Sequence, residues 1–201
     1  MKKSIWLSII ALFLCGTAQA SPNDVVSGAA DALAAALDGR KGELENDRDA
    51  LYELIDEILL PIFDRRYAAS LVLGRHWRTA SDEEKEAFVD AFYRSLLRKY
   101  GEGVLQFDQE SLEILPFRGD ESKKRATVKT IVRLEDGTKV PVNYGVVKRD
   151  SGWMMFDVTI EGISYVRNFR TELNAEIQAK GLPAVIDRLN NSGAEDEESA
   201  E

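Results

Sequence analysis

The stretch Trp153-Met-Met-Phe-Asp-Val-Thr-Ile-Glu-Gly-Ile-Ser-Tyr-Val-Arg-Asn-Phe-Arg170 decides the fold. Its first eight residues predict a β-strand, because aromatic and β-branched side chains dominate them. Glu161-Gly162 predicts a turn, and a helix is predicted from Ile163 to Lys180. The chain is therefore expected to close with a strand, a tight corner and a helix.

Three more strands are predicted upstream of this stretch. Residues 126–134 largely alternate between apolar and polar side chains, and Asp136-Gly137 is a strong hairpin signal. A return strand then leads to a second turn at residues 150–152, and residues 112–117 are a candidate for the first strand. Together the strands form a four-stranded antiparallel meander. The apolar side chains that share a face are Val128, Val132, Leu134 in one strand and Val140, Val142, Tyr144, Val146 in the next.

Helices are predicted on both sides of the strands. The first covers about residues 24–37, and Asn46 is a plausible N-cap of the second, which Pro61 interrupts. Ser81 and Glu84 have the spacing of a capping box, in which each side chain binds the other's backbone amide. The helices expected further along the chain end near Gly74, Tyr100, Lys180 and Asn190.

This order of helices, then strands, then helices predicts an α+β fold with helices packed on one face of a twisted sheet. Such a sheet can curl into a cone whose concave side faces the helices. The pattern alone leaves open whether the interior is filled or hollow.

The two ends of the chain differ from the middle in composition. Residues 1–20 predict a cleaved export signal, because Lys2 and Lys3 precede an apolar segment and Ala18-Gln19-Ala20 fits the cleavage pattern. The expected mature chain is one domain, residues 21–191, followed by a disordered acidic tail at residues 192–201. Loss of the two lysines takes the formal net charge from −9 to −11. An acidic chain without a basic stripe is a poor candidate for nucleic-acid binding.

The side chains needed for catalysis or metal binding are scarce. The chain has one Cys, Cys15, inside the predicted signal, and one His, His76. A thiol nucleophile, a disulfide and a transition-metal site are therefore not expected. Asp157 is the one carboxylate of interest, and simple alternation places it with Trp153 and Met155, opposite Phe156 and Val158. It is interpreted as a partner of backbone amides or of Arg170 at the strand-to-helix corner, with an acid/base role as the alternative.

Several segments, taken in order, resemble the MlaC (toluene-tolerance) family. They are Leu60-Pro61…Asp64, the residues from Ala68 to Gly74 with Trp77, Ser81…Phe88…Phe92, the hairpin at Asp136-Gly137, and Trp153…Asp157-Val158…Glu161-Gly162-Ile163-Ser164. The resemblance covers nearly all of the expected mature chain and stops before the acidic tail.

The resemblance implies a periplasmic phospholipid carrier that is not an enzyme and has no cofactor. Acyl chains would occupy an apolar cavity between sheet and helices, with phospholipid as cargo. Partners would be an outer-membrane lipoprotein–porin complex and an inner-membrane ABC transporter with a substrate-binding ring, and the carrier is expected to be a monomer. On helix faces and strand alternation, the expected lipid-lining residues are Leu71, Phe88, Phe92, Leu96, Val128, Val132, Val142, Tyr144, Val146, Phe156, Val158, Val166 and Phe169.

Two other functions stay open from the sequence. A cone-shaped isomerase or hydratase would use Asp157 and Tyr144 as acid and base. A periplasmic adaptor would have a solid core in place of a cavity.

Overall fold

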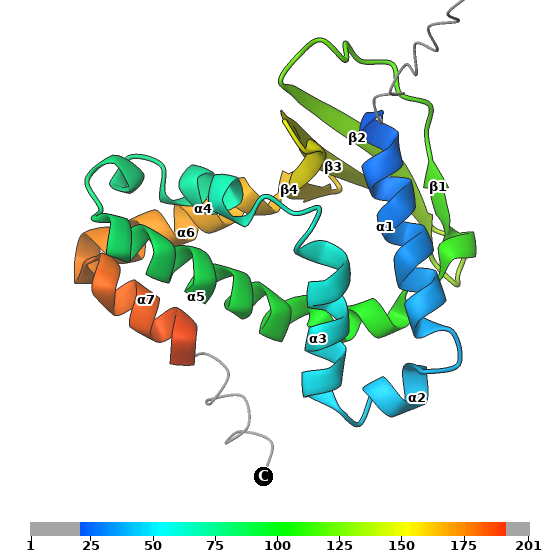
Figure 1. Ribbon diagram of the computed structural model, residues 1–201, viewed down its shortest axis with the longest axis horizontal. Helices are drawn as coiled ribbons and strands as arrows, with labels where there is room; N and C mark the ends of the chain where they lie inside the picture. Colours follow the sequence, from blue (N-terminus) through cyan, green and yellow to red (C-terminus); the bar gives the residue numbers. More distant parts are fainter. Residues whose placement is uncertain (1–20, 192–201) are drawn as a thin grey trace, which may run out of the picture.

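The computed structural model describes residues 21–191, which form seven α-helices and one antiparallel sheet in the order β1-β2-β3-β4-β5 (Figure 1). The predicted α+β meander is confirmed. The predicted export signal and acidic tail lie outside the described residues. The strands are β1 Leu112–Ile114, β2 Arg125–Arg133, β3 Lys139–Arg149, β4 Gly152–Ile160 and β5 Ile163–Ser164.

The sheet has five strands where four were predicted, because β5 takes the residues expected to begin the last long helix. Ile163 pairs with Ile160, and Ser164 pairs with Thr159. The helix α6, Tyr165–Lys180, begins after Ser164, whose side chain accepts a hydrogen bond from the Arg167 amide. An N-cap hydroxyl therefore fixes this boundary two residues later than the apolar pattern indicated.

One face of the sheet is apolar and covered, while the other carries cations. In β2, the buried side chains of Val128 and Thr130 alternate with the exposed side chains of Arg125, Lys129 and Arg133. The Thr130 hydroxyl donates to the backbone oxygen of Val142 on the neighbouring strand, so this buried polar group is satisfied. The alternation predicted for this strand is therefore confirmed.

A β-bulge interrupts the alternation in β4. Gly145 of β3 pairs with Asp157, but the next residue, Val146, pairs with Met155, so Phe156 has no partner in the ladder. Val158, which pairs with Tyr144, therefore shares a face with Met155. The expectation that Asp157 lies on the face of Met155 was wrong, since one extra residue reverses the parity of the strand.

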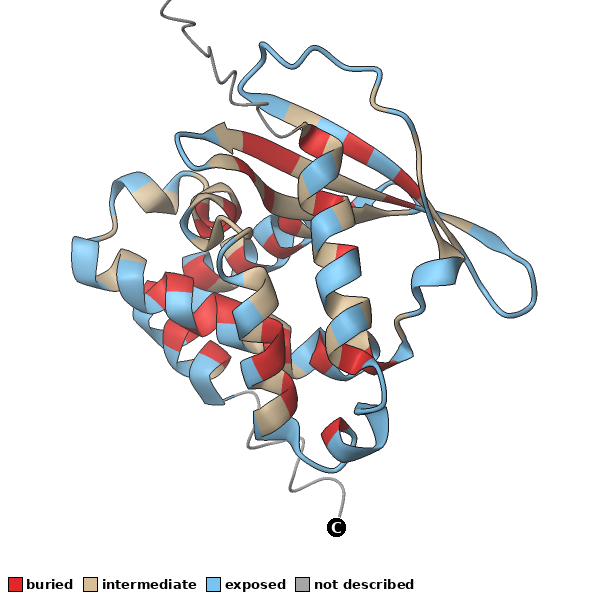
Figure 2. Ribbon diagram, turned by 45° about the vertical axis from the view of Figure 1, so that its right-hand side comes forward, coloured by how far each residue is buried: buried red, intermediate tan, exposed pale blue. Residues whose placement is uncertain are grey.

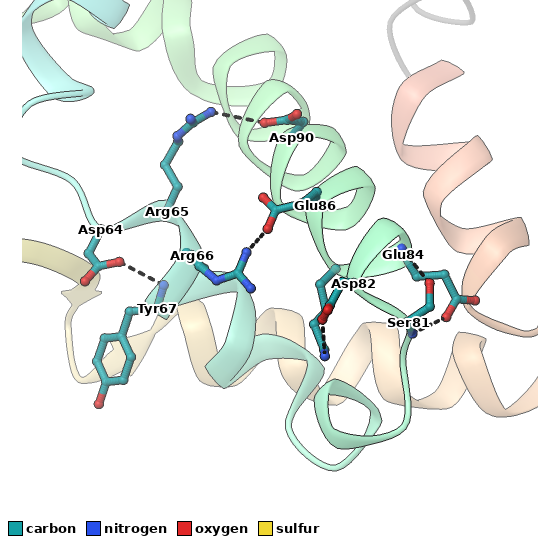
Figure 3. Close-up of polar contacts among 10 residues, drawn as sticks. Asp64, Arg65, Arg66, Tyr67, Ser81, Asp82, Glu84, Glu86 and Asp90 are labelled. Atoms are coloured by element: carbon teal, nitrogen blue, oxygen red, sulfur yellow. Dashed lines mark hydrogen bonds and ion pairs between the residues drawn. The ribbon is translucent and has the colours of Figure 1, made fainter.

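The helices begin at polar caps. The capping box is confirmed: the Glu84 amide donates to Ser81 Oγ at 3.1 Å, and the Ser81 amide donates to Glu84 Oε2 at 2.8 Å (Figure 3). The predicted cap at Asn46 is off by one residue, because Asp47 accepts from the Ala50 amide. The remaining helices are α1 Pro22–Leu37, α2 Lys41–Leu44, α3 Arg48–Leu59, α4 Arg65–Leu73, α5 Asp82–Tyr100 and α7 Leu182–Asn191, with 3₁₀ turns η1 His76–Arg78, η2 Gly101–Gln106 and η3 Gln109–Ser111.

Buried apolar residues form three clusters. Figure 2 marks the buried residues in red along the ribbon. The helical cluster joins α4, α5, α6 and α7, and includes Ala69, Phe88, Phe92, Phe169, Leu173 and Val185. The sheet cluster joins α1 to β2, β3 and β4, and contains Val26, Val128, Val146, Trp153 and Met155. The linking cluster joins the end of α1, α2, α3 and α5, and includes Leu37, Leu44, Leu51, Leu54, Tyr93 and Leu97.

The helices fall into two groups according to the cluster to which they contribute. α1 lies across the covered face of the sheet, whereas α4–α7 form a layered group beside it (Figure 1). β4 contacts both parts, since it packs against α1 on one side and against α4 and α6 on the other.

The segment between α3 and α4 ties the two parts together. The Met155 amide donates to the Ile62 carbonyl at 2.7 Å, and the Asp64 amide donates to the Met155 carbonyl at 2.8 Å. The Asp64 carboxylate accepts from the Tyr67 amide at the start of α4 (Figure 3) and from Arg149 Nε at the end of β3, at 2.9 and 2.7 Å. The three residues from Ile62 to Asp64 therefore provide both the pairing with β4 and the N-cap of α4.

Asp157 has a comparable structural position at the other end of β4. Its Oδ2 accepts from Ser164 Oγ at 2.6 Å and its Oδ1 accepts from the Val166 amide at 3.0 Å. The interpretation of Asp157 as a partner of backbone amides at the strand-to-helix corner is confirmed.

Replacement of this carboxylate is expected to destabilise the fold. Asp157→Ala should lower the free energy of unfolding by about 2 kcal/mol, because a helix cap and a charge-assisted hydrogen bond are lost together. Urea denaturation measures the change, with Asp150→Ala at an exposed turn as the control. Equal stability of the two variants would contradict the assigned cap.

Candidate functional site

An apolar cavity of about 140 Å³ lies between α1, α3 and the sheet. Side chains from six elements line it, so no single helix or strand forms it alone. The wall on the helical side consists of Val26, Ala29, Ala30 and Leu33 of α1, Ile55, Ile58 and Leu59 of α3, and Val104 of η2. Leu112 of β1, Tyr144 of β3, Met155 of β4 and Phe107 complete the lining.

The cavity exists because α1 presents small side chains toward the sheet. Ala29 and Ala30 lie in the middle of the helix and line the cavity together with Met155. Close-packed interiors contain few voids larger than a water molecule. A volume of this size, lined almost entirely by hydrocarbon, is therefore a feature that requires an explanation.

Tyr144 provides the one polar side-chain group among the lining residues. Burial raises the pKa of the Tyr144 phenol, because the phenolate would lose its hydration. The side chain stays neutral at physiological pH, and it offers a hydroxyl donor inside a hydrocarbon wall.

An open groove adjoins the cavity on the outside of the molecule. Acidic residues, Lys41 and apolar residues from the end of α1 to η3 line this groove together. Phe107 lines both the groove and the cavity, and its backbone oxygen accepts from Lys41 Nζ at 3.0 Å. Phe107 therefore lies at the boundary between a polar surface and an apolar interior. The polar residues of the groove are Asp31, Asp38, Lys41, Asp108 and Gln109.

The thirteen residues expected to line a lipid site divide between different parts of the fold. The helical cluster and its packed neighbours hold seven of them: Leu71, Phe88, Phe92, Leu96, Phe156, Val166 and Phe169. The sheet cluster and its neighbours hold Val128, Tyr144 and Val146. Val132, Val142 and Val158 share the covered face of the sheet through their pairing with Val140, Thr130 and Tyr144.

Of these thirteen residues, Tyr144 lines the cavity. The aromatic face of α5 instead packs within the helical cluster, where the rings of Phe92 and Phe169 meet edge to face at 5.3 Å. The residues that sequence reasoning missed come mainly from α1 and α3. A signal for them was present, since the apolar stripe of α1 contains alanines where a packed helix usually places larger side chains.

The acid/base alternative has no support in this geometry. Tyr144 pairs with Val158, so Asp157, the next residue in β4, projects from the opposite face of the sheet. Both carboxylate oxygens of Asp157 already accept hydrogen bonds. His76 is also engaged, with its Nε2 3.0 Å from Asn174 Oδ1 of α6.

Residues 21–191 show neither a metal site nor a membrane span. Within this range, no group of three or more His, Cys, Asp or Glu side chains is placed to hold a metal ion. No helix in the same range combines the length and hydropathy needed to cross a bilayer.

Comparison with known proteins identifies the family. Residues 27–191 match the family described as MlaC protein. The chain belongs to the MlaC family. The resemblance inferred from the sequence segments is thus confirmed.

Relatives of this MlaC family member match it over most of its length. It is 26% identical over 182 residues to the toluene tolerance protein ttg2D of Pseudomonas putida, which covers 90% of this chain and 84% of that protein. It is 20% identical over 200 residues to the intermembrane phospholipid transport system binding protein MlaC of Haemophilus influenzae, with 94% of each chain covered. A phospholipid-binding protein from Ralstonia solanacearum, solved with a phospholipid, has the same fold, with a TM-score of 0.80, 22% identity, and coverage of 88% of this chain and 98% of that one.

Truncations should separate the packed core of this MlaC fold from its cavity wall. Phe88→Ala is expected to lower the free energy of unfolding by about 3–5 kcal/mol, because Phe88 is fully buried in the helical cluster. Leu33→Ala, at the half-buried cavity wall, should cost about 1 kcal/mol. Urea denaturation of both variants tests the difference, and similar costs would mean that the cavity wall is packed as tightly as the core.

Proposed function

We propose that this protein is a phospholipid carrier that encloses acyl chains in the cavity between α1, α3 and the sheet. Membership of the MlaC family supports this function, as do the names of the relatives from H. influenzae and R. solanacearum. The observation that carries the proposal is the apolar cavity itself, which a solid-core adaptor would lack.

The energetics suit a carrier. Two acyl chains contain about 30 methylenes, and each is worth ~0.8 kcal/mol when removed from water. The gross gain is about 25 kcal/mol relative to water, but a bilayer already keeps the same methylenes dry. Exchange between membrane and carrier is therefore close to balance, and small changes at a docking surface can load or unload the lipid.

The cavity must widen when a lipid enters. Its volume of about 140 Å³ is close to that of an engineered cavity of ~150 Å³ that accepts benzene, which is far smaller than a diacyl lipid. The cavity wall draws residues from both the sheet cluster and the linking cluster, and α1 belongs to each of them. We expect entry of a lipid to loosen the packing of α1 and α3 on the sheet while the helical cluster stays intact.

The polar end of the lipid is proposed to lie in the groove outside Phe107. Phosphate and other charged groups are costly to bury, whereas the acyl chains gain from burial. A cavity that borders an open groove lets the acyl chains stay buried while the head group stays in water.

The cellular setting is part of the same proposal. The predicted export signal at residues 1–20 supports a periplasmic location. The carrier would act as a monomer that moves lipid between an outer-membrane lipoprotein–porin complex and an inner-membrane ABC transporter with a substrate-binding ring. It would use no cofactor and catalyse no reaction.

A residue that fills the cavity should block lipid binding. Ala29→Phe adds a phenyl ring to the wall of a cavity that is of the size known to accept benzene. The added ring would occupy space that an acyl chain needs. Native mass spectrometry is therefore expected to show less than about half of the wild-type amount of co-purified phospholipid.

Ala32→Phe is the matched control, because Ala32 lies on the exposed face of the same helix. Circular dichroism should show that both variants fold. If Ala29→Phe retains as much lipid as Ala32→Phe, the cavity is not the acyl-chain site.

A further inference from the structure

Tyr144 is the one residue of the cavity lining that carries a hydroxyl, and this half-buried side chain makes no side-chain hydrogen bond within residues 21–191. The Tyr93 hydroxyl donates to Asp56 Oδ1 at 2.6 Å, and the Ser164 hydroxyl donates to Asp157 Oδ2 at 2.6 Å. Thr130 donates to the Val142 carbonyl. The Tyr144 hydroxyl is not among the fully buried unpaired polar atoms of residues 21–191, which are Asn23 Oδ1 and Arg98 Nε, so it stays accessible while the cavity is empty. A ligand that fills the cavity would remove this access, and the hydroxyl would then need an acceptor.

Packing alone does not require the hydroxyl. A phenylalanine at residue 144 would supply the same ring to the sheet cluster without a hydroxyl that must be hydrated or hydrogen-bonded. The raised pKa of Tyr144 keeps the phenol protonated, so it can donate. When a ligand displaces water from the cavity, an acceptor on that ligand is the partner that the hydroxyl needs.

The position of the hydroxyl is well fixed. Tyr144 lies in the middle of β3 and is paired on one side with Val128 and on the other with Val158. The strand therefore holds the phenol in place on the wall opposite α1 and α3. A donor on the rigid wall can recognise one part of a ligand.

The remaining lining is hydrocarbon, which restricts the chemistry of the acceptor. A charged phosphate would be poorly solvated beside Val26, Ala30 and Ile55. An ester carbonyl carries no charge, accepts hydrogen bonds without donating any, and is attached directly to an acyl chain. The carbonyl can therefore enter the apolar cavity together with the acyl chain to which it is bonded.

We propose that the Tyr144 hydroxyl donates a hydrogen bond to an ester carbonyl of the bound lipid. This inference rests on the proposed function and makes the cavity selective for ester-linked acyl lipids over ether-linked lipids of the same chain length and head group. Tyr144 is then the residue that sets this specificity.

The test compares diester and diether phosphatidylcholines with equal chains, offered together in vesicles to delipidated protein. Native mass spectrometry reports the ratio of the two bound lipids. Wild type should favour the diester lipid by roughly two- to tenfold, the range that one neutral hydrogen bond supplies. Tyr144→Phe should bind the two lipids equally, and its delipidated form should melt at the same temperature as wild type or higher. Tyr100→Phe, at a partly exposed tyrosine of α5 that does not line the cavity, should keep the preference.

The outcomes separate the two proposals. Equal binding of both lipids by wild type, or a preference that survives in Tyr144→Phe, would overturn the role of the hydroxyl and leave the carrier function standing. An equal loss of both lipids in Tyr144→Phe would also overturn it, because the hydroxyl would then act on a part that both lipids share and not on the ester carbonyl. Binding of neither lipid by wild type would overturn the carrier function together with this inference.

Discussion

The bulge in β4 determines how the sheet meets the helices. Because Phe156 has no partner in the ladder, its side chain packs with the helical cluster and meets Tyr67 edge to face at 5.0 Å. Met155 before it faces the cavity, and Asp157 after it caps α6. Gly145, opposite the bulge, leaves the necessary room, since a Cβ there would lie 3.0 Å from the Phe156 ring and 3.2 Å from the Asp157 Cβ. A regular strand, whose side chains alternate strictly between two faces, could not direct Met155, Phe156 and Asp157 toward these three surroundings.

The cavity is a consequence of this arrangement. Two parts of the chain with their own apolar clusters are joined at β4 and at the segment from Ile62 to Asp64, which leaves the space between α1, α3 and the sheet to be closed by side chains. The small residues on α1 close it incompletely. The proposed carrier function depends on that incompleteness, because a well-packed interface would give hydrocarbon chains no place to enter.

Much of the fold could be predicted from the sequence because its signals are local. The box formed by Ser81 and Glu84 and the hairpin at Asp136-Gly137 depend on neighbouring residues, and both are found where they were expected. The bulge could not be predicted, since the pattern of Phe156, Asp157 and Val158 also fits regular alternation. It is set by helices that approach from distant parts of the chain.

The candidate site was harder to predict than the fold for a related reason. An aromatic stripe such as Phe88 and Phe92 looks the same whether it faces a ligand or another helix, and here it faces α6 and α7. Tyr144 was identified because strand alternation put it on the covered face. The alanines of α1 were visible in its apolar face but were not assigned to a cavity, because small side chains leave a space only where the opposing wall does not fill it.

The separation of the helical cluster from the cavity has an evolutionary meaning. Most of the largest fully buried side chains, such as Phe88, Leu73 and Leu173, lie away from the cavity wall. Natural proteins have little stability to spare, so residues that hold the fold together tolerate few changes. Substitutions in the cavity wall would draw less on that reserve. Under the proposed carrier function, such changes would alter which lipid fits while the helical cluster preserves the scaffold.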